Sequence, residues 1–175
     1  MLLLSISLAI PCRAQSAVDP LEYRIKAAFV CKFLGYVEWP PLAFAAADSP
    51  IVISVLASDA IIDEVSRTAA GLSVDGRALT VRKFQRGESL AGTHLVYIAA
   101  TDEARLAESI AALKSLPILV VTEATRGLPS GSMINFVVVD DKVRFDIAPH
   151  VAEASRLKIS ARLLGVARSV IGKAS

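Results

Sequence analysis

The pattern of apolar and polar positions is clearest around Asp140-Asp141, where two β-rich runs meet. The first run, Ile134–Val139, is apolar at almost every position, which predicts a strand inside a sheet with both faces covered. The second run, Lys142–Ile147, alternates between polar and apolar residues, so it predicts one dry face and one wet face that carries Asp146. The two runs together predict an antiparallel hairpin whose first arm is central and whose second arm lies near an edge.

Upstream of the hairpin, apolar runs of two kinds follow one another. Apolar residues at helical spacing predict a helix over residues 21–37, which must end by Pro40-Pro41. Short continuous apolar runs predict buried strands at 51–57, 94–100 and 117–122. Helices are predicted between these strands, over residues 60–70 and from Thr101 or Asp102 to residue 114. A tight Asp75-Gly76 turn predicts a small hairpin between 72–74 and 77–84.

After the main hairpin, Pro149 predicts a short helix over 148–155, residues 157–159 are extended, and Ser160 caps a last helix through residue 170. Strands that alternate with helices indicate an α/β fold. The predicted fold is therefore a mostly parallel sheet with helices on both faces and a C-terminal antiparallel β-hairpin.

Composition and charge narrow the function classes. The 175 residues are 54% hydrophobic with a net charge of +2, which indicates one globular domain and argues against a nucleic-acid partner. The chain has two histidines, far apart in sequence, and none of the common nucleophile, metal or phosphate-binding motifs. We therefore predict no catalytic residues, no metal site, no cofactor and no enzymatic activity.

The first sixteen residues resemble a secretory signal peptide. A short apolar core precedes small residues suitable for cleavage, although no Lys or Arg precedes the core, as expected if the true start codon lies further upstream. This predicts a secreted protein, released by cleavage of residues 1–16. Cleavage would leave Cys31 as the lone cysteine, which we interpret as a buried, inert thiol.

Polar residues follow the ends of three predicted parallel strands. In open α/β sheets, ligands bind at the carboxyl ends of the strands, so these residues are candidates for a small-molecule or cation site. The candidates are Ser58, Asp59, Thr101, Asp102 and Glu123, with the Thr122 hydroxyl beside them. The alternative is that Asp59 and Asp102 are helix caps. Lys26, within the apolar arc of the first helix, is expected to lay its stem along the core with its ammonium in water.

Three blocks of sequence resemble the YfiR-like family of periplasmic proteins. They are residues 23–40 (YRIKAAFVCKFLGYVEWP), 131–147 (GSMINFVVVDDKVRFDI) and 157–164 (LKISARLL), and a VDGR at 74–77 also fits. The resemblance covers roughly residues 21–170, and the predicted domain spans residues 21–172. Two residues depart from the pattern of the family. Asp141 replaces the glycine that is usual in the hairpin turn, and the turn requires a positive φ at this position. Arg156 replaces a glycine before the last block, so the short helix is expected to end differently.

The resemblance implies a regulator that represses a membrane-bound signalling enzyme, a diguanylate cyclase, from the periplasmic side. The partners it implies are the periplasmic domain of an inner-membrane sensor or cyclase, an outer-membrane protein that sequesters the regulator, and a second copy of the chain. Apolar side chains of the first and last helices are the candidates for partner binding: Phe33, Tyr36, Trp39, Leu163 and Leu164. The alternative function is a periplasmic small-molecule-binding sensor module that uses the strand-end residues.

Overall fold

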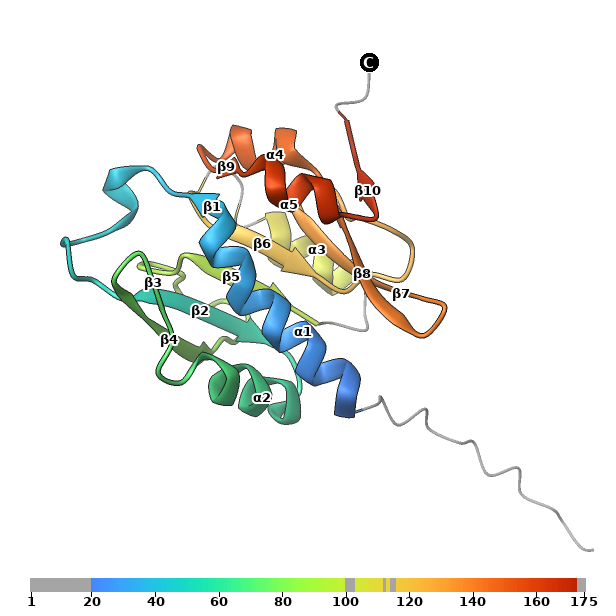
Figure 1. Cartoon of the computed structure of the whole chain (residues 1–175), viewed down its shortest axis with the longest axis horizontal. Helices are drawn as coiled ribbons and strands as arrows, with labels where there is room; N and C mark the ends of the chain where they lie inside the picture. Colours follow the sequence, from blue (N-terminus) through green and yellow to red (C-terminus); the bar gives the residue numbers. More distant parts are fainter. Residues whose placement is uncertain (1–19, 100–102, 112, 114–115, 173–175) are drawn as a thin grey trace, which may run out of the picture.

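The computed structural model describes residues 20–99, 103–111, 113 and 116–172. An eight-stranded sheet, with strand order β10-β8-β7-β6-β5-β2-β4-β3, runs through the centre of the domain (Figure 1). Its middle strands, β2 (Ile51–Leu56), β5 (Leu95–Ile98) and β6 (Leu119–Thr122), are parallel to one another and almost wholly buried. The predicted α/β class with a mostly parallel sheet is confirmed.

Right-handed crossovers place helices on both faces of this sheet. The chain leaves β2 through α2 (Asp59–Ala69) and returns as β4 (Arg77–Lys83) on one side of β2. It leaves β5 through α3 (Glu103–Ala111) and returns as β6 in the opposite direction across the sheet. Because parallel crossovers are almost always right-handed, opposite directions put α2 and α3 on opposite faces. The helix α1 (Pro20–Phe33) packs beside α2 (Figure 1).

The first helix is shorter than the pattern predicted. It ends at Phe33 rather than residue 37, continues as a 3-10 turn (η1, Leu34–Tyr36), and leads into a two-residue strand, β1 (Val37–Glu38). β1 pairs with β9 (Lys158–Ile159), so a long-range strand contact replaces the last helical turn. No helix among the residues described has both the length and the apolar character to cross a bilayer.

Both predicted hairpins form. In the smaller one, β3 (Ser73–Val74) pairs with β4 through Asp75 and Gly76, which have φ of 51° and 77°. In the larger one, β7 (Ile134–Val139) pairs with β8 (Lys142–Ile147). Asp140 and Asp141 have φ of 49° and 56°, so the turn has the geometry expected of an Asp-Gly sequence without its glycine.

Two burial expectations for the larger hairpin were wrong. β7 pairs with β6 only through Ile134 and Asn135, so its second half extends beyond the sheet and exposes Val138 and Val139 (Figure 1). Asp146, predicted on the solvent face, is buried because the chain returns as an additional strand, β10 (Ser169–Val170), beside β8. The Arg168 guanidinium forms a two-pronged ion pair with the Asp146 carboxylate, with 2.8 Å between Nε and Oδ1.

The C-terminal helices also differ from the prediction. The last helix, α5 (Ala161–Val166), stops four residues before the predicted end, and its chain continues into β10. The short helix α4 (Pro149–Ala154) does not need a different ending. Arg156 adopts φ 62°, and the N–H groups of Arg156 and Leu157 donate to the carbonyls of Glu153 and Ala152. This is the bond pattern of a glycine-type helix end, formed here with an arginine in the left-handed region.

Aromatic rings join α1 to the sheet. Phe29 and Phe33 of α1 pack against Phe136 of β7 and Phe145 of β8, with ring centroids 5.0 to 6.2 Å apart. Tyr97 of β5 meets Phe136 edge-on at 5.9 Å. These contacts fix α1 across the sheet and thereby determine where its polar residues lie.

Candidate functional site

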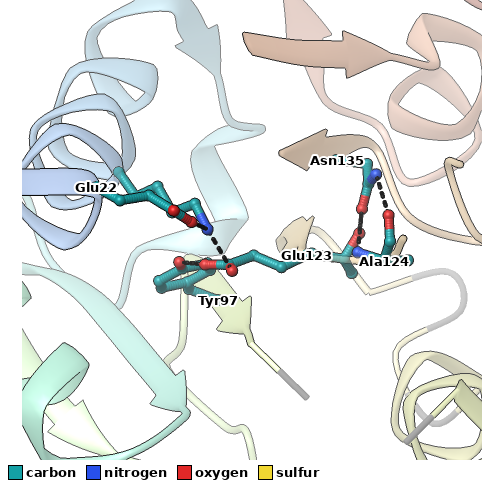
Figure 2. Close-up of polar contacts among 7 residues, drawn as sticks. Glu22, Tyr97, Glu123, Ala124 and Asn135 are labelled. Atoms are coloured by element: carbon teal, nitrogen blue, oxygen red, sulfur yellow. Dashed lines mark hydrogen bonds and ion pairs between the residues drawn. The ribbon is translucent and has the colours of Figure 1, made fainter. Parts of the chain in front are cut away.

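A buried ionic cluster lies between α1 and the carboxyl ends of β5 and β6. The Lys26 ammonium is 2.5 Å from Oε2 of Glu123 and 2.5 Å from Oε1 of Glu22. The Tyr97 hydroxyl donates to the other oxygen of Glu123 (Figure 2). Lys26 is only 5% exposed, so the expectation that its ammonium reaches water was wrong. A buried ammonium requires such partners, because desolvation of an unpaired charge is costly.

Burial and ion pairing shift the pKa values of Lys26 and Glu123 in opposite directions. Burial alone would lower the pKa of Lys26, but attraction to Glu123 and hydrogen bonds to Glu123 and Glu22 outweigh it and raise that pKa above its ordinary value. Burial raises the pKa of Glu123, and the opposing attraction of Lys26 does not cancel this effect. Lys26 is therefore held as a cation and is not a candidate base.

A side chain from the neighbouring strand fixes the backbone next to Glu123. The buried Asn135 amide accepts a hydrogen bond from the Ala124 N–H at 2.7 Å and donates to the Ala124 carbonyl at 3.0 Å (Figure 2). Its oxygen also accepts from the Thr122 hydroxyl at 2.8 Å. Asn135 thus supplies the hydrogen bonds that a neighbouring strand would otherwise make at the point where β6 has ended. The backbone held in this way sets the direction of the Glu123 side chain. The Thr122 hydroxyl is used within this network and does not face a crevice.

Glu123 also lines a cavity of about 310 Å³. The wall contains two acidic side chains, Glu22 and Glu123, and one basic side chain, Lys26. Its apolar part comes from Phe136, Val137 and Val138. The volume suits a small molecule with an apolar body and a polar or cationic end.

A second hollow, a groove of about 360 Å³, lies between α1 and α5. Three of the predicted partner-binding residues line it: Phe33 and Leu163 are buried at its floor, and Tyr36 is 38% exposed. Val166 adds an apolar side chain that is 66% exposed. Lys32 and Arg162, both exposed, give the groove a basic rim. Such a surface suits an apolar side chain of a partner with a carboxylate beside it.

The two other partner-binding candidates are not among the residues that line this groove. Trp39 is half-buried, and its indole N–H donates to the His94 carbonyl at 3.3 Å. Leu164 is also half-buried and packs against the core.

Among the described residues, the strand-end candidates do not line a common cavity. Ser58 is the N-cap residue of α2, without a side-chain capping bond, and is exposed. The exposed Asp59 carboxylate pairs with Lys83 at 2.6 Å. Neither lines the cavity at Glu123. Thr101 and Asp102 lie outside the described residues.

Other chemistry is limited in the part of the chain that the structure describes. No group of three histidine, cysteine or acidic side chains is placed to hold a metal ion there. Cys31 is buried, and burial raises the pKa of its thiol to about 11, so little reactive thiolate forms at neutral pH. The interpretation of Cys31 as a buried thiol is confirmed.

Sequence reasoning missed Lys26 and Tyr97 as partners of Glu123. The available signal was a lysine within an apolar helical arc, because a charge that falls on the buried face needs a partner from elsewhere in the chain. The pattern does not show which carboxylate supplies it.

Comparison with known proteins identifies the family of the chain. No curated protein sequence matches the chain significantly. The sequence signature of the YfiR/HmsC-like family matches residues 23–168, which include most of α1, the central strands, the β7–β8 hairpin and α5. The match covers most of the chain, and the protein is a member of the YfiR/HmsC-like family.

Proposed function

We propose that this protein is a periplasmic regulator that binds the outward-facing part of an inner-membrane signalling enzyme, a diguanylate cyclase, and holds it inactive. The observation that carries the proposal is membership of the YfiR/HmsC-like family, which implies a regulatory role. A regulator of this kind shifts its target only by as much as it binds the inactive state more tightly. Its contact surface must therefore fit one state of the enzyme better than the other.

The groove between α1 and α5 is the surface we assign to this contact. It combines an apolar floor with exposed apolar side chains and a basic rim, and three side chains predicted from the sequence line it. An exposed aromatic or aliphatic anchor in such a hollow is typical of interface centres. The proposed target segment is apolar with flanking carboxylates. An outer-membrane partner that sequesters the regulator would act by competing for the same groove.

Introduction of a negative charge within the groove tests the proposal. Val166→Glu places a carboxylate on a side chain that is 66% exposed, so folding should be almost unaffected while an apolar partner is repelled. Leu42→Glu is the matched control, because Leu42 is 94% exposed and is not among the residues that line the groove. Deletion of the gene should raise cellular cyclic di-GMP, and complementation with Leu42→Glu should restore the low level while Val166→Glu should not.

Two results would overturn parts of this account separately. Unchanged cyclic di-GMP after deletion would remove the proposed target, whatever the variants do. Full repression by Val166→Glu, with normal protein levels, would remove the groove but not the regulatory role.

The cavity beside Glu123 favours a second candidate, a small-molecule sensor module. Native mass spectrometry of protein purified from the periplasm discriminates between the two candidates. A metabolite that is bound by the wild type and lost in Val138→Glu, whose side chain is 49% exposed in the cavity wall, would support the sensor. Capture of a membrane enzyme without a bound metabolite would support the regulator.

A further inference from the structure

His94, immediately before β5, lines neither hollow, yet both nitrogens of its imidazole are held by backbone groups. The residue is 3% exposed. Its Nδ1 accepts a hydrogen bond from the Val52 N–H at 3.1 Å, and its Nε2 lies 3.2 Å from the Ala43 carbonyl oxygen. A backbone N–H can only donate and a carbonyl can only accept, so the ring must carry its proton on Nε2. The structure therefore selects the neutral imidazole in a single tautomer.

A second proton on His94 has no acceptor. It would have to enter at Nδ1, where the Val52 N–H already points at the ring, so one hydrogen bond would be replaced by two opposed donors. The side chains of the other neighbours of the ring provide no hydrogen-bond acceptor for this proton. Phe44 stacks on it at 4.5 Å, and Trp39 meets it edge-on at 6.5 Å.

The surrounding charge also disfavours protonation. Arg77 of β4 lies over the Phe44 ring, 3.9 Å from its centroid, so a charged imidazole would share that ring with a second cation. Among the described residues, Arg77 is the charged group that acts on His94; β2 and the 39–49 segment contact the imidazole through Val52, Ala43, Phe44 and Trp39, which carry no charge. Burial has the largest effect and holds the pKa of His94 below its ordinary value of 6.5; the hydrogen bond to the Ala43 carbonyl opposes it, and Arg77 adds a smaller lowering effect.

The contacts of His94 attach one particular segment to the sheet. Residues 39–49 connect β1 to β2 along the edge of the molecule and include a 3-10 turn, η2 (Pro41–Ala43) (Figure 1). The segment reaches His94 through the Trp39 indole, the Ala43 carbonyl and the Phe44 ring. Arg77 supplies a second attachment by donating to the carbonyls of Ala46 and Ser49. Much of the remainder is exposed, so few other contacts hold the segment in place.

We propose that His94 is an acid-responsive switch, whose protonation detaches the segment of residues 39–49 from the start of β5. The proton binds more readily once the ring has left its two backbone partners, so acid favours the detached form. The ratio of detached to attached protein rises up to tenfold for each pH unit below about 6.5, until the lower pKa of the attached form is reached. This property belongs to the chain alone and does not depend on the proposed cyclase.

The composition of the chain gives the test a natural reporter and a natural control. Trp39 is the sole tryptophan, and His94 and His150 are the two histidines. Acrylamide quenching of Trp39 fluorescence from pH 7.5 to 5.0 measures how accessible the segment is. In the wild type, the quenching constant should rise at least about twofold below pH 6.5. His94→Gln should give a constant that does not change with pH, because an amide can accept and donate but does not titrate in this range.

The His150→Gln variant should respond to pH as the wild type does, because the His150 ring is bonded to the Ile171 carbonyl, far along the chain from the segment. A wild-type curve without a rise would overturn the proposal. So would a rise that persists in His94→Gln, or one that disappears in His150→Gln.

A measurement on the unmodified protein covers the case in which His94→Gln does not fold. Nitrogen NMR of the two imidazoles reports tautomer and titration directly. The proposal requires a protonated Nε2 and a bare Nδ1 at His94 at pH 7.5, and a His94 titration that coincides with the change at Trp39. A protonated Nδ1, or a His94 titration at or above pH 6.5, would overturn it.

Discussion

The Lys26 ammonium contacts the Glu123 carboxylate at 2.5 Å, although 97 residues separate them in the sequence. Lys26→Met would leave the two partly buried carboxylates of Glu123 and Glu22 without their cation. We expect this change to lower the free energy of unfolding by about 3 kcal/mol. Glu123→Gln should cost a similar amount, because it weakens the pairing of a buried ammonium. Urea denaturation at neutral pH measures both.

A double-mutant cycle isolates the pair. Lys26→Met/Glu123→Gln should be less destabilised than the sum of its two single changes by about 1 kcal/mol or more. The exposed pair Lys83–Asp59 is the control, with a distance of 2.6 Å but half or more of each side chain in solvent. Lys83→Met should cost less than about 1 kcal/mol. Additive changes at Lys26 and Glu123 would contradict a coupled buried pair.

Gly131 is required for packing as well as for backbone conformation. Its φ is 88°, and a Cβ there would lie 2.6 Å from Cγ2 of Ile110 in α3. Gly127 has φ 100° with nothing near its missing Cβ, so the two glycines differ mainly in this contact. Gly127→Ala should cost about 1 kcal/mol for conformation alone. Gly131→Ala should cost about 2–4 kcal/mol, because overpacking is added. If the two variants lowered the melting temperature equally, the additional packing cost at Gly131 would be refuted.

Arg156 occupies a left-handed position that glycine adopts more easily. Since its side chain is exposed and φ is 62°, Arg156→Gly should raise the free energy of unfolding by about 1 kcal/mol. Arg156→Ala tests whether the gain comes from the backbone, and should give no such increase. Glu153→Gly, within α4, should instead destabilise by about 1 kcal/mol. The idea fails if Arg156→Gly is less stable than the wild type in chemical denaturation.

The ion pair between Asp146 and Arg168 attaches β10 to the sheet, and its two side chains are buried to different degrees. Asp146 is 3% exposed, whereas the Arg168 side chain is 42% exposed. Arg168→Met would leave a buried carboxylate without its cation, while Asp146→Leu would leave an arginine that is free to turn into solvent. We expect Arg168→Met to lower the urea midpoint further than Asp146→Leu.

Hydrogen exchange gives a local measurement of the same attachment. Arg168→Met should also speed exchange at the Ile171 N–H, which donates to the Ile147 carbonyl at 2.7 Å beside the pair. A larger loss in Asp146→Leu, or unchanged exchange at Ile171 in Arg168→Met, would contradict this unequal attachment.

Much of the fold follows from local patterns. The buried strands β2, β5 and β6, the helices between them, the Asp140-Asp141 turn and the Ser160 cap of α5 were all predicted, because periodicity and turn chemistry act on residues near in sequence. The candidate sites followed only in part. Phe33, Tyr36 and Leu163 do line one groove, whereas Glu123 is joined to Lys26 and Tyr97 rather than to the other strand-end residues.

The sequence by itself determined the order of strands and helices, the hairpin turn and the apolar faces that had to be covered. Only the tertiary structure decided what covers each polar residue on those faces. It paired Lys26 with Glu123, returned β10 to bury Asp146, and enclosed His94 between Val52 and Ala43. The reason is physical: backbone conformation responds to neighbours within a few residues, whereas the state of a buried charge depends on groups that the chain brings from far away.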